Sequence, residues 1–191
     1  MIEMSTATPK VIILAGPNGA GKSTLAPRLI RDAVGIDQFV NADVIARGLS
    51  AFDPDSAAIE AGRVFRQRTS FAFETTLSSR SLKPRLESLR AAGYAIHLHY
   101  VWLRTPDMAV YRVRDRVRQG GHNVPEETVR RRYARGVRNF FELFRPIADS
   151  WGVYDNSGAE GPVTIATGSG EDEITVERPA LWAQFRAVGG L

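Results

Sequence analysis

The sequence predicts an α/β fold, a three-layer sandwich in which helices pack against a mainly parallel five-stranded sheet. Three observations support this prediction. Short apolar runs alternate with segments of helical periodicity, the order that produces parallel strands joined by helices. The chain has 191 residues, 43% hydrophobic and 24% charged, which is the size and composition of one globular domain. No internal repeat or Pro/Ser-rich linker interrupts it, so we expect residues 1–191 to form a single domain.

Five apolar segments are the predicted strands. The first, residues 11–15, is a continuous apolar run, as expected of a strand buried on both faces. The others are residues 38–42, 70–74, 95–103 and 151–154. Two further segments, 163–166 and 173–176, flank a Gly-Ser-Gly turn and predict a hairpin, with a short helix from Pro179. We place this small C-terminal hairpin and helix at about residues 160–191.

Capping and turn residues mark the predicted helices. One helix follows the glycine-rich turn after the first strand, and another opens at Asp53-Pro54. Gly93 is expected to end the helix before the fourth strand. Thr105-Pro106-Asp107 begins a helix that Gly120-Gly121 ends, and a longer helix opens at residues 124–127. The longer helix has an apolar stripe that we expect in the core, made of Val129, Tyr133, Val137, Phe140, Phe141 and Phe144.

The net charge of +4 comes from a central block of arginines. Eleven arginines and five acidic residues lie between residues 104 and 145. Four of these arginines, at positions 112, 114, 116 and 118, fall on one predicted helix, and the Gly120-Gly121 pair after it suits a hinge. We therefore predict an Arg-rich helical lid over about residues 104–125.

Several classes of protein are excluded by composition. The chain has no cysteine, which excludes disulfide scaffolds, thiolate metal sites and cysteine nucleophiles. No apolar stretch approaches the length of a membrane span, and the first ten residues lack a secretory pattern. We therefore expect a cytoplasmic location and no membrane partner. His97 and His99 alternate along one strand without a third ligand, so we expect them to be packing residues.

One motif predicts nucleotide binding. The segment GPNGAGKS fits the phosphate-binding P-loop pattern G-x-x-x-x-G-K-[ST], between a predicted buried strand and a predicted helix. Lys22 is expected to reach the β- and γ-phosphates and Ser23 to bind Mg²⁺, so ATP and Mg²⁺ are the predicted cofactors. The predicted ATP-binding residues are Gly16, Pro17, Asn18, Gly19, Ala20, Gly21, Lys22, Ser23 and Thr24.

The remaining motifs narrow the class of P-loop protein. The chain lacks the Asn-Lys-x-Asp of GTPase switches and the Leu-Ser-Gly-Gly-Gln of transporter ATPases. None of its apolar strands ends in the four-apolar-plus-Asp pattern expected of an oligomeric ATPase motor. A single compact domain with an Arg-rich lid fits a small kinase, so we predict a P-loop kinase-like fold.

Candidate acceptor-site residues follow the predicted second and third strands, at the sheet edge where ligands bind in such folds. Asp43 is the predicted base for an acceptor hydroxyl, with Asn41 beside it. Glu74 ends the third strand and is predicted to bind Mg²⁺ through water or to contact substrate. The other predicted substrate-binding residues are Thr75, Arg80 and His122. From the lid, Arg116 and Arg118 are the predicted catalytic arginines on the transferred phosphate.

Four blocks of sequence are similar to the zeta-toxin family of P-loop kinases, closest to its branch of predicted ATPases or kinases. The blocks are GPNGAGKST (16–24), NADVIARGL (41–49), FAFETTLSSR (71–80) and RVRQGGHNVPEETVRRR (116–132). The resemblance implies transfer of the γ-phosphate of ATP to the 3′-hydroxyl of UDP-N-acetylglucosamine, with an antitoxin protein as partner. Within it, Lys22 matches the P-loop lysine, Asp43 the aspartate that activates the sugar hydroxyl, and Glu74 the substrate-binding glutamate; Arg116 or Arg118 resembles the first lid arginine.

The sequence departs from that family at two places. The toxins have Asp-x-Asp where this chain has Asn41-Ala42-Asp43, and a second lid arginine where it has the turn 120–123. Three alternatives therefore stay open: a kinase for an antibiotic, nucleotide or nucleoside, an ATP-hydrolysing nucleic-acid-binding switch, or a catalytically silent partner-binding protein. Nucleic acid is the less favoured partner, because the aromatic residues of the central block fall on the apolar stripe.

Overall fold

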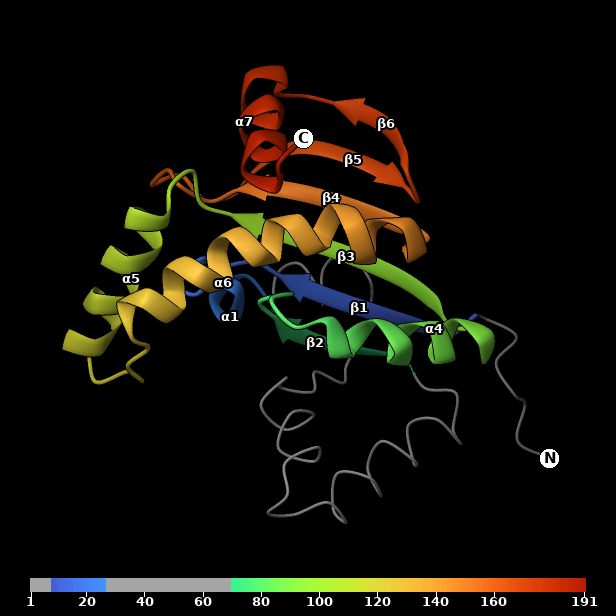
Figure 1. The fold of residues 1–191 in the computed structure, drawn as a ribbon, viewed down its shortest axis with the longest axis horizontal. Helices are drawn as coiled ribbons and strands as arrows, with labels where there is room; N and C mark the ends of the chain where they lie inside the picture. The colour runs from blue at the N-terminus through green and yellow to red at the C-terminus, as the bar shows by residue number, and fades with distance from the viewer. Residues whose placement is uncertain (1–7, 27–69) are drawn as a thin grey trace, which may run out of the picture.

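The computed structural model describes residues 8–26 and 70–191, and their central feature is a six-stranded sheet with the order β2-β1-β3-β4-β5-β6 (Figure 1). The strands are β1 (Lys10–Ala15), β2 (Phe71–Thr75), β3 (Ala95–Trp102), β4 (Ser150–Asp155), β5 (Val163–Ser169) and β6 (Asp172–Val176). The first four pair in parallel, and β5 and β6 are antiparallel to their neighbours. The predicted α/β, P-loop kinase-like fold is confirmed.

The described helices lie where the sequence predicts helices. They are α1 (Lys22–Ala26), α4 (Lys83–Ala91), α5 (Pro106–Arg118), α6 (Glu126–Asn139) and α7 (Pro179–Gly189), with short 3₁₀ helices at Arg80–Leu82 and Arg145–Ile147 and a π-helical segment at Phe140–Phe144. The hydroxyl of Thr105 caps α5 by accepting a 3.2 Å hydrogen bond from the Met108 amide. The predicted strand at 38–42, the helix at Asp53-Pro54 and the residues Asn41 and Asp43 lie outside the described residues.

The predicted C-terminal hairpin is present, and the structure adds its place in the fold. β5 pairs with β4, so the hairpin extends the main sheet. Its first strand also continues through Ser169, into the expected Gly-Ser-Gly turn. Gly168 lies opposite Trp151 in this pairing, and a glycine there leaves room for the indole ring. The sheet is therefore mixed rather than a parallel sheet with an appendage.

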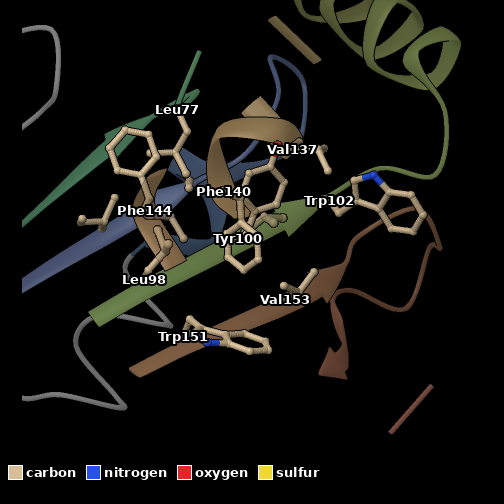
Figure 2. Packing of buried hydrophobic residues seen from close by; sticks show 14 of the residues in the cluster. Leu77, Leu98, Tyr100, Trp102, Val137, Phe140, Phe144, Trp151 and Val153 are labelled. Atoms are coloured by element: carbon tan, nitrogen blue, oxygen red, sulfur yellow. The ribbon is translucent and has the colours of Figure 1, made fainter. Parts of the chain in front are cut away.

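The core lies between the sheet and α6, which crosses it in Figure 1. All six residues of the predicted apolar stripe are buried. Figure 2 shows Phe140 and Phe144 packed beside Tyr100 and Leu98 of β3. The hydroxyl of Tyr133 joins α6 to the end of β3, because it accepts a hydrogen bond from Trp102 Nε1 at 2.9 Å and donates one to the Leu103 carbonyl at 2.7 Å. This anchor fixes the position of α6 over the end of the sheet where the P-loop lies.

The terminal helix α7 completes the core. Its Trp182 ring stacks on Trp151 of β4 with centroids 5.6 Å apart, and Phe185 is fully buried against Phe140. The acidic C-terminal part of the chain thus contributes a cluster of aromatic rings to the main fold. Within residues 8–26 and 70–191, no helix combines the length and apolar character needed to cross a membrane.

Candidate functional site

The P-loop emerges where β1 ends, at the edge of the sheet that also carries the ends of β2, β3 and β4. Its backbone is fixed by hydrogen bonds, among them one from the Gly16 amide to the Thr75 carbonyl at 3.2 Å. Gly19 has a φ of +78°, and a Cβ there would lie 2.8 Å from the Ala109 carbonyl oxygen of α5. Only glycine therefore allows the loop to lie this close to α5.

Asn156, directly after β4, supports the P-loop from behind. Its side-chain amide donates to the Ala20 carbonyl at 2.8 Å, and its backbone N–H donates to the Trp102 carbonyl at 2.9 Å. The preceding Asp155 is buried and accepts a 2.8 Å hydrogen bond from Arg104 Nε. The sequence analysis missed this support. Its signal was present, however, because Asp155 and Asn156 are polar residues following a strand at the ligand-binding edge.

The side chains of Ser23 and Glu74 are in contact, as expected if both bind the same metal ion. The Ser23 hydroxyl donates to Glu74 Oε2 at 3.1 Å. Within residues 8–26 and 70–191 there is no group of three or more His, Cys, Asp or Glu residues that could hold a metal by itself. Mg²⁺ bound with a nucleotide needs only one or two protein oxygens, because water and phosphate fill the other positions. The Ser23–Glu74 pair therefore fits Mg²⁺ held together with a nucleotide.

Lys22 is a half-buried cation in the P-loop. Its ammonium donates to the carbonyls of Gly16 at 2.8 Å and Pro17 at 2.9 Å. Burial lowers the pKa of Lys22 from 10.5 to about 8; the Glu74 carboxylate opposes this change, and the Arg116 and Arg132 guanidinium groups add to it. The two carbonyl oxygens accept the hydrogen bonds of the ammonium group, which in P-loop proteins contacts phosphate oxygens.

Two arginines, Arg116 of α5 and Arg132 of α6, lie near enough to Lys22 to lower its pKa. Arg116 also donates to the His122 carbonyl at 2.9 Å, across the glycine turn. Arg132 was not predicted as a site residue, because nothing in its sequence neighbours distinguishes it from the other arginines of α6. In the structure, Arg132 is next to Tyr133, whose hydroxyl holds α6 against the end of β3. Arg118 is exposed and makes no ion pair or hydrogen bond within the described part of the chain.

Other arginines of the central block join α5 to α6. Arg130 contacts Asp107 at 2.6 Å and Glu126 at 2.8 Å, and Arg114 contacts Glu126 at 2.6 Å. The first half of α5 is also part of the core, since Ala109, Val110 and Val113 are buried. The first half of α5 therefore belongs to the core, and the lid over about residues 104–125 stays a prediction.

The remaining predicted site residues occupy separate positions. Thr75 Oγ1 accepts a 3.1 Å hydrogen bond from the Leu77 amide, and Arg80 lies at the surface, 3.7 Å from Glu142. The side chain of His122 is exposed on the turn after α5. The other two histidines, at positions 97 and 99, contact Ser150 and Tyr154 of β4, in agreement with packing roles. The predicted base Asp43 and its neighbour Asn41 are outside the described residues.

Comparison with solved structures confirms the fold. AvrRxo1-ORF1 in complex with AvrRxo1-ORF2, crystallised with ATP, superposes with a TM-score of 0.65 at 16% identity. The match covers 96% of this chain but only 65% of that one. A structure from the PezAT chromosomal toxin–antitoxin system of Streptococcus pneumoniae superposes with a TM-score of 0.59 at 16% identity, covering 97% of this chain and 86% of that one.

Comparison of sequences shows the family. An uncharacterised protein of Haemophilus influenzae is 34% identical over 132 residues, which are 65% of this chain and 92% of that protein. A family model described as an AAA domain matches residues 11–143, the span from β1 to the end of the α6 region. This span is more than half of the chain and includes Lys22, Ser23, Glu74, Arg116 and Arg132. The chain therefore belongs to the AAA domain family, and its fold is that of the P-loop kinases.

Proposed function

We propose that this protein is an ATP-dependent kinase that phosphorylates a hydroxyl group of a small molecule, with a UDP-sugar such as UDP-N-acetylglucosamine as the leading acceptor. The observation that supports a kinase best is the group of side chains around the P-loop. Lys22, Arg116 and Arg132 supply three cations, and the Ser23–Glu74 pair supplies oxygens for Mg²⁺. Phosphoryl transfer depends mainly on such positioning and charge stabilisation.

In the proposed reaction, the Asp43 carboxylate accepts the proton of the acceptor hydroxyl. The hydroxyl oxygen forms a bond to the γ-phosphorus of ATP, and the bond between that phosphorus and the β–γ bridging oxygen breaks, releasing ADP. Lys22 leaves its loop carbonyls to contact the β- and γ-phosphates, and Arg116 and Arg132 approach the transferred group. Ser23, together with Glu74 through water, would hold Mg²⁺, which would supply further positive charge.

The acceptor rests on the sequence resemblance, and a direct experiment tests it. The protein is incubated with ATP, Mg²⁺ and a panel of UDP-sugars, antibiotics and nucleosides, and the products are examined by mass for one added phosphate. Phosphorylation of a UDP-sugar supports the full proposal, whereas phosphorylation of another compound replaces the acceptor and keeps the kinase. ATP hydrolysis with no phosphorylated product overturns it in favour of a switch.

Asp43→Ala tests the proposed base. We expect turnover to fall by about 10²–10⁴-fold, the usual contribution of a general base, with nucleotide affinity nearly unchanged. Equal turnover in the two proteins removes Asp43 from the mechanism.

The proposed partner is an antitoxin protein. Two structures with the same fold were solved from paired systems, AvrRxo1-ORF1 with ORF2 and PezAT. Growth arrest on expression of this chain, abolished by Lys22→Ala, is the expected result. Normal growth with active protein argues against a toxin and hence against a need for an antitoxin.

A further inference from the structure

A polar pocket opens between the loop after β2 and the second half of α6. Its volume is 590 Å³, and it is lined by Ser78, Ser79, Arg80, Arg135, Arg138 and Asn139. This volume falls within the range of about 300–1,000 Å³ that is usual for small-molecule sites. Every lining residue is polar and half of them are arginines, so the pocket suits a hydrophilic, negatively charged ligand.

The loop that forms one wall is held in a strained conformation. Leu77 is buried and has a φ of +53°, which is uncommon for a residue with a side chain. Its amide donates to Thr75 Oγ1 at 3.1 Å, and its carbonyl accepts a 2.6 Å hydrogen bond from Asn139 of α6. Such strain persists where surrounding contacts enforce it, and it is frequent at ligand sites. Both serines of the wall, Ser78 and Ser79, are thereby fixed opposite α6.

The pocket is next to the nucleotide site. Arg135 follows Arg132 by three residues on α6, a rise of about 4.5 Å along the helix axis. Gly136 brings α6 against the same loop, since a Cβ there would lie 2.5 Å from the Thr76 carbonyl oxygen. Along the loop, Ser78 is four residues from Glu74, at most about 14 Å. One small molecule can therefore place a hydroxyl near the transferred phosphate and an anionic group in the pocket.

Two of the three pocket arginines have no acidic partner within the part of the chain that the structure describes. Among residues 8–26 and 70–191, neither Arg135 nor Arg138 forms an ion pair, and Arg80 is 3.7 Å from the exposed Glu142. Other arginines of α6 are paired, for example Arg131 with Glu127 at 3.8 Å. The guanidinium fork matches phosphate oxygens in shape and charge.

We propose that this pocket binds a phosphate or diphosphate group of the acceptor, which makes the acceptor a phosphorylated sugar or a nucleotide sugar. Assignment of the pocket to the acceptor rests on the proposed kinase function. Three arginines disfavour a cationic acceptor such as an aminoglycoside, and a neutral sugar leaves their charge uncompensated. The serine hydroxyls and Asn139 provide hydrogen-bonding groups beside the anion.

Binding is tested on full-length protein saturated with a non-hydrolysable ATP analogue and Mg²⁺, so that the P-loop cannot accept the probe. Calorimetric titrations use UDP, N-acetylglucosamine 1-phosphate, gluconate and unmodified N-acetylglucosamine. We expect the two phosphorylated compounds to bind and the other two to bind at least about tenfold more weakly. UDP binding more tightly than the sugar phosphate identifies a diphosphate site, and the reverse identifies a monophosphate site.

Variants connect the binding to the arginines. Replacing the two α6 arginines of the pocket, Arg135→Gln with Arg138→Gln, is expected to weaken binding of the phosphorylated probes by at least about tenfold. Arg131→Gln, on the same helix but outside the pocket, serves as the matched control and should bind as wild type. Unchanged thermal unfolding of the double variant shows that the fold is retained.

Different experimental outcomes contradict the phosphate-binding pocket and the kinase function. Equal binding of gluconate or the neutral sugar, or equal binding by the double variant and the control, overturns the phosphate site. Phosphorylation of an acceptor that carries no phosphate also overturns it while leaving the kinase intact. Arginine-dependent binding without phosphate transfer to any compound supports the pocket and overturns the kinase.

Discussion

The side-chain amide of Asn156 donates a 2.8 Å hydrogen bond to the carbonyl oxygen of Ala20, joining the loop after β4 to the P-loop across 136 positions of sequence. The same asparagine is fixed to β3 through the Trp102 carbonyl. The P-loop is therefore held from two sides, by α5 at Gly19 and by Asn156 at Ala20. This support determines how well the loop is organised before a nucleotide arrives.

Removing the Asn156 amide should weaken nucleotide binding. Asn156→Leu preserves most of the volume but leaves the Ala20 carbonyl without its partner, at a cost of about 1–3 kcal/mol in unfolding free energy. Affinity for an ATP analogue should fall with it, as measured by calorimetry beside urea unfolding. Ser157→Ala, which leaves the bond to Ala20 in place, is the control. Wild-type affinity in Asn156→Leu would show that this bond does not organise the loop.

Glu74→Gln should act on the metal and not on the nucleotide. Glutamine keeps the shape and can still contact Ser23 Oγ, but it removes the charge that would hold water on Mg²⁺ in the proposed site. Outer-shell carboxylates typically change metal affinity by about 10–100-fold, so the Mg²⁺ concentration needed for analogue binding should rise by that factor. Metal-free nucleotide binding should change little. The control is Glu87→Gln on α4, and an unchanged Mg²⁺ requirement in Glu74→Gln would remove this carboxylate from the site.

Arg132→Gln tests whether Arg132, unlike its neighbours on α6, acts at the proposed phosphate site. A positioned arginine contributes about 10³–10⁵-fold to turnover in related chemistry, so ATP turnover should fall by at least about 100-fold. The pKa of Lys22 should also rise, because one of the charges that lowers it is gone. Arg131→Gln, on the outer side of α6, should alter neither quantity. A loss of turnover with no change in Lys22 titration would indicate a structural effect of the substitution.

The fold was predictable where its signals are local. Three features depend on residues that are close together in the sequence: the P-loop, the cap at Thr105 and the apolar stripe that begins on α6. The structure has all three at the predicted positions. The pairing of the hairpin with β4 has no local signature in the sequence, so the hairpin itself was predictable but its place at the edge of the sheet was not.

The candidate site divides in the same way. Glu74 could be placed because it follows an apolar strand at the ligand edge. Arg132 could not, because its place near Lys22 arises only when α6 packs beside the P-loop. Asn156 carries the same signal as Glu74, a polar residue after a strand, but its bond to Ala20 is a long-range contact with no local signature. The sequence does not show which arginines of the central block form ion pairs. In the structure, Arg114 and Arg130 join α5 to α6, whereas Arg135 and Arg138 line a pocket.

Phe185→Ala should show that the C-terminal helix belongs to the main core. Phe185 is fully buried and its ring contacts those of Tyr100, Trp102 and Phe140. Truncating a buried phenylalanine costs about 3–5 kcal/mol, which urea unfolding measures. Ala187→Ser, at an exposed position of the same helix, should change stability by less than about 0.5 kcal/mol. A small effect of Phe185→Ala would mean that α7 is not needed for the core.

Deprotonation of Lys22 at high pH should have opposite effects on nucleotide affinity and on the stability of the unliganded protein. Its pKa is lowered to about 8 in the unliganded protein, whereas the unfolded chain keeps the ordinary value of 10.5. Between these values the unfolded chain binds more protons, so the stability of the unliganded protein should rise with pH. Phosphate requires the charged ammonium and raises its pKa, so nucleotide affinity should fall above pH 8, by up to about tenfold per pH unit. Lys22→Arg remains charged throughout, and both slopes should disappear in it. Nucleotide affinity that stays flat from about pH 7.5 to about 9.5 in the wild-type protein would show that Lys22 does not titrate in this window.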